Sequence, residues 1–487
     1  MTLTLLTLLV GVLPLLGALP MPAAARQALG PQMDDPPAQV RHELTTLRAA
    51  QGIAADMALR IDDLLATVAG ASTPAGLRNA ARHADAIGAG LAESVQQPLR
   101  IALDSMAEYL RLRAVFGNAW ACVEFPESQG NQDFSAYHQP WEVDSEVRLV
   151  GARDGVRTEI IGTTLRGRPI HAVRVGTGDR VVFVQAGIHG NEATGTTAVI
   201  NLLNELSDGS DRSRQIREAL TVVAIPMLNP DGAAHYQRAN DQTWEETVAL
   251  FPQLGAAAEA FHHSLPGPRF WGDPRVAGYD VNRDFSPDFT DLPQPGDLPG
   301  TSSATGLYLT AEARASRDLY AALESEFGLV DVFIDLHNQA PCNTFDHDGD
   351  PATPARYTPM SISAQMIRDP VARGAGTEYP NFDWDASRRA NVAAWQALQE
   401  LGAPYANITR YPQNLDLAGS AVAAYQLRGS AGVLMEASRQ RNSTPAWRLD
   451  FLVEVHQRAI RGIIDALADA ALSSIDPDLY DAIPVRN

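Results

Sequence analysis

The stretch VVFVQAGIHGNE, residues 181–192, places an imidazole and a carboxylate where a predicted strand ends. Its first eight residues are mostly apolar, and a short apolar run bounded by polar residues is typical of a buried strand in a parallel sheet. His189 and Glu192 follow this run, three residues apart. Ligands gather at the carboxyl ends of the strands in open α/β sheets, so the pair indicates the start of a metal site.

Two further apolar runs end in side chains that the same site would need. Residues 330–336 end at His337, and residues 432–435 end at Glu436. If both runs are buried strands of one sheet, their carboxyl ends meet at the same edge. The sequence therefore predicts that three sequence-distant groups converge on one crevice.

These residues match the donors of a hydrolytic zinc site. Such a site usually holds one Zn²⁺ ion with three protein ligands, leaves one position for water, and often uses two histidines and a glutamate. His189, Glu192 and His337 supply that set, which leaves Glu436 free to act as the base. Taken singly, each ligand also has a structural interpretation, as a helix-start residue, a first-turn dipole partner or a core histidine. Their joint occurrence favours the metal.

Composition narrows the class of protein. The 487 residues carry 58 acidic and 38 basic side chains, a net charge of -20, and every basic residue is Arg. Binding to a phosphate backbone needs a basic footprint, so nucleic acid is not an expected partner. Cys122 and Cys342 are the only cysteines, too few for a thiolate zinc site, and whether they pair stays open.

The first residues predict export. Residues 1–19 are almost entirely apolar, and Ala23, Ala24 and Ala25 give the small-residue spacing of a cleavage site, so residues 1–25 are predicted to be a signal peptide. A membrane helix is the alternative, although Pro14 favours a cleaved leader. We expect a periplasmic or secreted protein with no membrane span after signal removal.

The rest of the chain divides by pattern. Residues 26–125 form a predicted helical region, read as a brace, an activation segment or an accessory domain, and residues 126–146 form a linker. Strand-like and helical runs alternate over residues 147–475, which predicts one α/β catalytic domain. Residues 476–487 are assigned to a C-terminal tail.

Arginines offer hydrogen-bond donors for an anionic substrate. Arg238 follows the turn NPDG at residues 229–232, and Arg283 lies in DVNRD at residues 280–284. A guanidinium can grip a carboxylate with two parallel hydrogen bonds. Arg283 with Asn282 therefore suits a chain-terminal carboxylate.

Six blocks in order make the chain resemble a zinc metallocarboxypeptidase of the carboxypeptidase A type, across residues 161–439. The blocks are residues 161–170, 186–192, 229–232, 280–283, 335–337 and the strand that carries Glu436. The resemblance implies an α/β fold with a mixed, largely parallel sheet flanked by helices, here preceded by a small helical region.

The resemblance also implies roles. Zinc would be bound by His189, Glu192 and His337, with Glu436 as general base and acid. The terminal carboxylate would be received by Asn282 and Arg283. Arg238 would polarise the carbonyl, and Asp280 would orient a ligand imidazole. Tyr411 would cover the substrate, with Tyr425 as the competing choice.

Some residues depart from the family pattern or have two interpretations. Asp284 stands where many relatives place Asn, and we expect it to weaken the attraction of Arg283 for an anion. Residues 241–276 are an apparent insertion, and Ala421 brings no charge to the expected specificity pocket.

Asp335 faces the same side as His337, either as its partner or in a structural hydrogen bond. The remaining candidates are read as loop residues: His262, His263, Asp346, His347, Asp348 and Asp350.

The leading hypothesis is an exported zinc metallocarboxypeptidase acting on C-terminal peptide bonds. An N-acyl-amino-acid deacylase of the aspartoacylase type, or an amidase of cell-wall (murein) peptides, is an alternative on the same site. The long helical preface and the separate strand for Glu436 favour a peptidase. A non-catalytic binding module is the alternative from another class, although the complete set of ligands and base argues against it.

Overall fold

The computed structural model describes residues 55–70, 74–88, 138–263, 278–290, 292–340, 343–346, 355–402, 405–412, 414–440 and 446–486. The chain divides into two compact units. One comprises Met1–Glu124, Gly402–Pro404 and Pro445–Phe451, and the other comprises Phe125–Leu401, Tyr405–Thr444 and Leu452–Asn487. The candidate site lies in the second unit.

The described part of residues 26–125 is a pair of helices, α4 (Ala55–Gly70) and α5 (Pro74–Gly88). Proline suits the first turn of a helix because it has no N–H to leave unpaired there. The Arg60 guanidinium donates to the carbonyl of Ala86 at 3.0 Å, so the start of α4 lies beside the end of α5. Ile61 and Ile87 are among the buried side chains of the pair.

An eight-stranded sheet forms the centre of the second unit, in the order β1-β2-β4-β3-β5-β10-β8-β9. Its strands are β1 (Val156–Thr163), β2 (Pro169–Gly176), β3 (Arg180–Ala186), β4 (Leu220–Ile225), β5 (Val332–Gln339), β8 (Met360–Ser363), β9 (Thr409–Arg410) and β10 (Ala431–Ser438). A separate two-stranded sheet pairs β6 (Thr344–Phe345) with β7 (Arg356–Tyr357).

The sheet is mixed, with its parallel strands at the centre. The pairs β4–β3, β3–β5, β5–β10 and β8–β9 are parallel, whereas β1–β2, β2–β4 and β10–β8 are antiparallel. The central strands are buried along their length, as strands covered by helices on both faces must be. The predicted fold class is confirmed.

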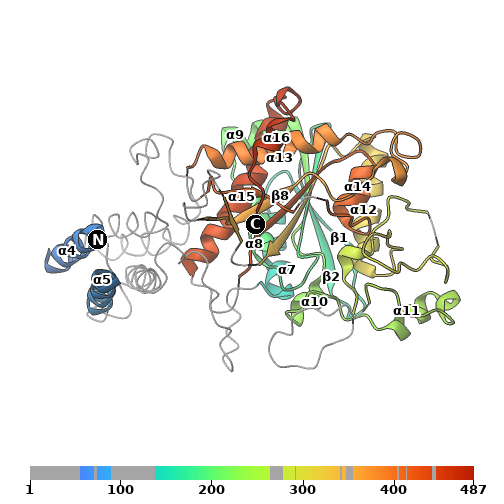
Figure 1. Ribbon diagram of the computed structural model, residues 1–487, viewed down its shortest axis with the longest axis horizontal. Coiled ribbons are helices and arrows are strands. Elements are labelled where there is room, and N and C mark those ends of the chain that lie inside the picture. The colour runs from blue at the N-terminus through green and yellow to red at the C-terminus, as the bar shows by residue number, and fades with distance from the viewer. Residues whose placement is uncertain are drawn as a thin grey trace. The chain divides into compact units, whose positions relative to one another are not determined.

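Helices cover both faces of the sheet (Figure 1). One face packs on α12 (Ala311–Phe327) and α14 (Ala421–Leu427), and the other on α8 (Thr194–Leu206) and α15 (Ala446–Ala468). The remaining described helices of this unit are α7 (Pro140–Gly151), α9 (Asp211–Ala219), α10 (Pro230–Ala234), α11 (Trp244–Leu250), α13 (Trp384–Gln399) and α16 (Leu479–Ala482), with 3₁₀ turns at Pro252–Leu254, Val281–Arg283, Val371–Arg373 and Leu472–Ser474.

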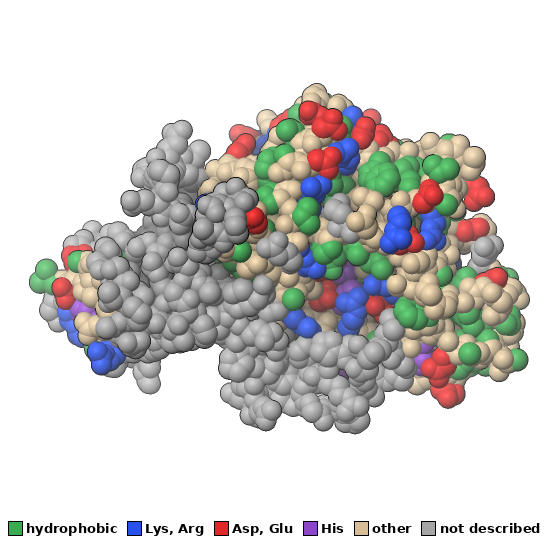
Figure 2. Space-filling view, in the orientation of Figure 1, with side chains coloured by type: hydrophobic (Ala, Val, Ile, Leu, Met, Phe, Trp, Pro, Cys, Tyr) green, Lys and Arg blue, Asp and Glu red, His purple; other side chains and the backbone are tan. Residues whose placement is uncertain are grey.

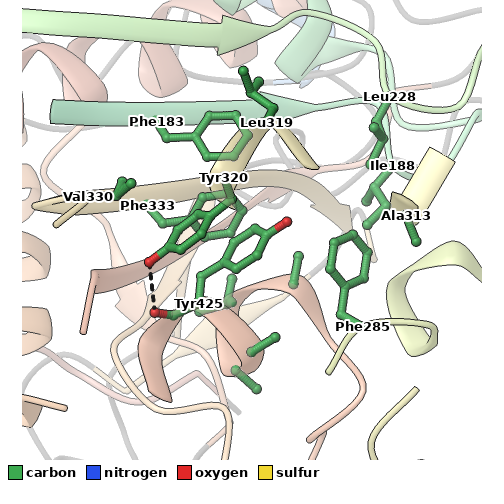
Figure 3. Close-up of a cluster of buried hydrophobic side chains, with 14 of the residues drawn as sticks. Phe183, Ile188, Leu228, Phe285, Ala313, Leu319, Tyr320, Val330, Phe333 and Tyr425 are labelled. Atoms are coloured by element: carbon green, nitrogen blue, oxygen red, sulfur yellow. Dashed lines mark hydrogen bonds between the residues drawn. The ribbon is translucent and has the colours of Figure 1, made fainter. Parts of the chain in front are cut away.

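Aromatic rings fill the core between the sheet and helices α12 and α14 (Figure 3). The ring of Tyr425 stacks on that of Tyr320 at 4.0 Å, and Phe333 meets Tyr425 edge-on at 4.7 Å. Edge-on and offset arrangements suit the charge distribution of aromatic rings. On β5, the face that begins with Phe333 continues with Asp335 and His337, so the apolar core gives way to polar groups at the strand's carboxyl end.

The α/β unit extends beyond both limits that the sequence predicts. Helix α7 begins at Pro140, inside the predicted linker, and buries Val143, Val147 and Val150 at helical spacing. Near the other end, Tyr480 and Ile483 are buried, although residues 476–487 were expected to be a tail. Both segments therefore belong to the packed unit.

Within the described residues, no helix combines the length and the apolar character needed to cross a bilayer.

Candidate active site

Three sequence-distant side chains converge at the carboxyl ends of β3 and β5. A carboxylate oxygen of Glu192, Oε2, lies 2.9 Å from Nδ1 of His189 and 3.0 Å from Nδ1 of His337, and the two Nδ1 atoms are 3.1 Å apart. All three side chains are buried. Figure 2 shows histidine, acidic and arginine side chains gathered in a recess near the middle of the face it displays.

These three donor atoms fit a zinc ion. Zinc–nitrogen and zinc–oxygen bonds of about 2.0–2.1 Å in a tetrahedral site put neighbouring ligand atoms roughly 3.3 Å apart. The observed separations are close to that value, and one ligand atom from each residue can face a common centre. The donor set and its spacing therefore match a zinc site with one position left for water.

Close backbone contacts fix the loop that carries His189 and Glu192. Gly187 has a φ of 64°, which glycine adopts without strain. A Cβ on Gly190 would lie 2.0 Å from the carbonyl carbon of Gly232, so only glycine permits this approach. The side chain of Asn229 joins the two loops, since its Nδ2 donates to the carbonyl of Ile188 at 3.2 Å.

Glu192 is held as a charged carboxylate. Its Oε2 accepts the backbone N–H of Asn338 at 3.1 Å. Burial would raise the pKa of Glu192, but the neighbouring imidazoles of His189 and His337 lower this pKa well below its ordinary value. The ionised form is the one that binds a cation.

His189 is oriented by Asp280. The Nε2 atom of His189 lies 3.1 Å from Oδ1 of Asp280, which leaves Nδ1 facing Glu192. The other carboxylate oxygen of Asp280 accepts from Nε of Arg238 at 3.0 Å. Burial would raise the pKa of Asp280, but Arg238, Arg283 and His189 lower it well below its ordinary value. A carboxylate behind a ligand imidazole fixes the ring and its tautomer.

A buried chain of hydrogen bonds lies behind His337. Its Nε2 is 3.0 Å from Oδ2 of Asp335, and Oδ1 of Asp335 accepts from Nε2 of Gln185 at 3.4 Å. Gln185 Oε1 accepts from the Ser316 hydroxyl, which also lies 2.9 Å from the hydroxyl of Tyr425. Asp335 therefore orients the imidazole, which resolves the two interpretations left open by the sequence.

The charge around His337 favours a cation. Burial would lower the pKa of His337, but Asp335 and Glu192 raise it well above its ordinary value. The same two carboxylates favour a bound metal ion at its Nδ1.

Glu436 lies beside the three ligands without being one of them. In the parallel pairing of β10 with β5, Glu436 is opposite His337. Burial raises the pKa of Glu436, while the imidazole of His337 opposes this shift. A carboxylate whose pKa moves toward neutrality is suited to accept and return a proton.

Arg238 contacts two of the candidate ligands in addition to Asp280. Its Nη1 is 3.2 Å from Nδ1 of His189 and 3.4 Å from Oε1 of Glu192. The predicted insertion separates Arg238 from Asp280 in the sequence, yet the structure places this arginine at the candidate metal centre.

Arg283 carries a half-buried positive charge. Its Nη1 donates to the carbonyl of Asn282 at 2.7 Å, and among the described residues no carboxylate lies within ion-pair distance of it. Burial lowers the pKa of Arg283, and the charge of Asp280 opposes this. The Asn282 amide accepts from the backbone of Ala421 at 3.0 Å, and its Nδ2 lies 3.2 Å from His337. Arg283 is therefore the group with donors left for a substrate anion.

The two candidate tyrosines occupy different environments. Tyr425 is fully buried in the aromatic core, which excludes it from covering a substrate (Figure 3). Tyr411 follows β9 and is partly buried, and its backbone N–H donates to the carbonyl of Ile362 at 2.8 Å. The charge of Glu436 is the main cause that raises the pKa of Tyr411 to about 12. Tyr411 thus stays the candidate of the two for covering a substrate.

Asp284 makes structural contacts in the folded protein. Its side chain is fully buried, and its oxygens accept from the backbone of Leu309 at 3.0 Å and of Thr310 at 2.7 Å. It therefore holds the residues that begin α12. The expectation that Asp284 weakens the attraction of Arg283 for an anion finds no support in these contacts.

The other sequence candidates lie apart from the ligands or outside the described residues. His262 lies 3.4 Å from Asp284, and His263 lies 2.9 Å from Glu259. Ala421 is buried at the start of α14. The following lie outside the described residues: Cys122, Cys342, His347, Asp348, Asp350 and residues 264–277 of the predicted insertion.

Two contributors were missed from the sequence. The backbone N–H of Asn338 supports Glu192, and its position directly after His337 in a strand was a usable signal. Arg486 lies over the ring of Tyr411, 4.3 Å from its centroid. Nothing in the local pattern of residues 476–487 indicates that contact.

The fold and the site together define an α/β protein with a buried centre of two histidines and one glutamate, the donor set of zinc hydrolases. A profile of the zinc carboxypeptidase family matches residues 151–431, more than half of the chain, and the chain belongs to this family. The predicted family is confirmed, and so is zinc as its cofactor, for which the triad of His189, Glu192 and His337 provides the binding residues.

Individual relatives match over parts of their length. Carboxypeptidase B of Astacus astacus is 25% identical over 120 residues, which cover 24% of this chain and 39% of that protein. Zinc carboxypeptidase A 1 of Anopheles gambiae is 23% identical over 262 residues, 52% of this chain and 54% of that protein. The chain thus spans between about two fifths and about half the length of these relatives.

Solved structures of similar proteins also carry carboxypeptidase names. Carboxypeptidase A from Helicoverpa armigera shares 17% identity with a TM-score of 0.46, covering 75% of this chain and 81% of that one. A metallo-carboxypeptidase from Burkholderia cenocepacia shares 16% identity with a TM-score of 0.42, covering 68% and 70%.

Proposed function

We propose that this protein is a zinc-dependent carboxypeptidase that hydrolyses the last peptide bond of substrates with a free C-terminal carboxylate. The observation that carries the proposal is the half-buried guanidinium of Arg283, without an ion-pair partner among the described residues, near the centre formed by His189, Glu192 and His337. A substrate carboxylate would supply the missing negative charge.

Each group of the site has one role in the proposed reaction. When bound, zinc lowers the pKa of a coordinated water to roughly 7 and polarises a carbonyl. Glu436 takes the proton from the attacking water and later gives it to the leaving amine, for which its raised pKa is suited. Arg238, which reaches both His189 and Glu192, donates to the carbonyl oxygen as it gains negative charge.

The terminal carboxylate distinguishes this reaction from endopeptidase cleavage. Arg283 would bind it through two N–H groups, and the second N–H of the Asn282 amide could add a third donor. Tyr411, which follows β9, would cover the bound residue. Binding at these groups fixes the scissile bond near the metal, so that reaction requires little further loss of freedom.

A peptide library tests the proposal. Purified protein, treated with chelator or supplied with zinc, is incubated with matched peptides that end in a free carboxylate or an amide, and with N-acyl amino acids, and products are read by mass spectrometry. We expect zinc-dependent removal of single C-terminal residues from the free-acid peptides alone. Deacylation of N-acyl amino acids, equal cleavage of the amidated peptides, or inertness with bound zinc would contradict it.

We also propose that the protein is exported. The support is the apolar stretch at residues 1–19 and the small residues Ala23, Ala24 and Ala25, which lie outside the described residues. Expression of the full chain followed by fractionation and N-terminal sequencing is expected to give a periplasmic or secreted product that begins near Arg26. A cytoplasmic product with an intact first residue would contradict export.

A further inference from the structure

Residues 483–486 are joined to β9 by backbone hydrogen bonds. The N–H of Arg410 donates to the carbonyl of Pro484 at 2.6 Å, and the N–H of Arg486 donates to the carbonyl of Arg410 at 3.2 Å. Val485 forms a parallel bridge with Arg410. Ile483 is fully buried, so the segment is anchored by packing as well as by its backbone. Its side chains therefore have fixed positions beside the residue that follows β9, Tyr411.

The side chain of Arg486 connects two elements of the candidate active site. Its guanidinium lies over the ring of Tyr411, 4.3 Å from the centroid, and its Nη1 donates to Oε1 of Gln339. Gln339 is buried at the end of β5, two residues after His337 and on the same face. Arg486 thus connects the strand of a zinc ligand to the ring of Tyr411.

The charges around Tyr411 match this arrangement. Glu436 raises the pKa of Tyr411 and is the largest cause of its shift, whereas the guanidinium of Arg486 opposes it. Glu192 and Arg238 act on the same phenol with opposite signs. The phenol of Tyr411 is therefore subject to the charges of both the Glu436 carboxylate and the Arg486 guanidinium.

We infer that Arg486 is a positioning residue of this active site, which holds the ring of Tyr411 in place by stacking on it while anchored to Gln339. The inference rests on the proposed function, because the position of Tyr411 affects kinetics only if substrates bind beneath it. Arginine suits the task, since its planar group can stack on a ring and donate hydrogen bonds in its own plane at the same time.

Kinetics with a double-mutant cycle test the inference. Arg486→Ala is expected to raise KM for a free-acid tripeptide roughly two- to fivefold, the range of an exposed cation–π contact, with kcat changed less than about twofold. In a Tyr411→Ala background, Arg486→Ala is expected to have no further effect on KM. Arg174→Ala is the matched control, because Arg174 stacks on Phe327 at 5.1 Å. Additive effects of the two substitutions would overturn the inference.

A spectroscopic measurement keeps the inference separate from the proposed function. In protein labelled with 3-fluorotyrosine, the ¹⁹F resonance of Tyr411 is assigned with Tyr411→Phe. Arg486→Ala is expected to shift this resonance, and Arg174→Ala to leave it in place, in thermally stable variants. An unmoved resonance in Arg486→Ala would overturn the inference even if the enzyme is active. A shifted resonance in a protein without peptidase activity would overturn the proposed function and leave the contact standing.

Discussion

Glu436 on β10 lies directly opposite His337 on β5 in the parallel register of the two strands. Paired residues of neighbouring strands point to the same face of a sheet, so the carboxylate and the imidazole share one side. Backbone hydrogen bonds of two buried strands therefore set the position of the proposed base relative to a zinc ligand. Such a scaffold is more rigid than a pair of loops.

This geometry predicts a separation of metal binding from catalysis in Glu436→Gln. The amide retains the shape of the side chain but cannot take a proton, and it is not one of the three ligands. We expect kcat to fall by about 10²- to 10⁴-fold with zinc content unchanged, as measured by peptide hydrolysis and by metal analysis. Glu326→Gln, a change in the exposed pair with Arg174, is the control. Loss of zinc together with activity would show that Glu436 is a ligand.

The strands that build the site could be predicted because they are short, apolar and end in polar residues. The runs at residues 181–186 and 330–336 correspond to β3 and the first part of β5. His337 and Glu436 lie inside their strands rather than after them, because β5 continues through the buried polar residues Asn338 and Gln339, and β10 continues through Ala437 and Ser438. Hydrophobic pattern alone cannot show where such a strand ends.

The contacts made by buried polar side chains could not be predicted. From its place beside Arg283, Asp284 was expected to act on the substrate anion, yet its carboxylate accepts a hydrogen bond from Thr310. The two residues are too far apart in the sequence for a periodic pattern to link them. Tyr425 and Tyr411 are the same type of residue, and only their surroundings in the folded protein distinguish them. Arg486 reaches Tyr411 from a segment without a strand pattern. In each case three-dimensional packing decides the role.

Asp335→Asn tests the buried hydrogen bonds behind His337. Asp335 accepts from Gln185 and lies 3.0 Å from Nε2 of His337, so the amide should weaken the orientation and basicity of this ligand. We expect zinc affinity to fall roughly 10- to 100-fold, measured by competition with a chromophoric chelator. Asp331→Asn is the matched control on the same chain segment, because Asp331 accepts the backbone N–H of Val181 away from the ligands. Equal affinities in the two variants would count against the role of Asp335.

Asp284→Asn separates a structural role from an electrostatic one. The carboxylate accepts from Leu309, from the Thr310 backbone and from the Thr310 hydroxyl, and an amide nitrogen cannot accept any of these. We expect the free energy of unfolding to fall by about 1–3 kcal/mol, measured with urea, while KM for free-acid peptides stays unchanged. A KM several-fold lower at unchanged stability would instead show that Asp284 repels the substrate.

The burial of His456 predicts that the stability of the α/β unit depends on pH. It is fully buried on α15, and burial lowers its pKa from 6.5 to about 4, opposed by the backbone of Met435. Because the folded-state pKa is depressed, the unfolded chain takes up a proton first as the pH falls. The contribution of the neutral imidazole to the free energy of unfolding is fully present above about pH 6.5 and is lost progressively as the pH falls to about 4.

We therefore expect His456→Gln to flatten the fall in unfolding free energy between pH 6.5 and pH 4 by up to about 3 kcal/mol, since each pKa unit corresponds to about 1.4 kcal/mol. The measurement is urea unfolding of both proteins at a series of pH values and constant zinc. His235→Gln is the control, because the side chain of His235 is 40% exposed. If wild type and His456→Gln lose stability in parallel over this window, the imidazole of His456 takes up its proton over the same pH range in the folded protein as in the unfolded chain, and α15 must then carry that charge in contact with the strand of Glu436.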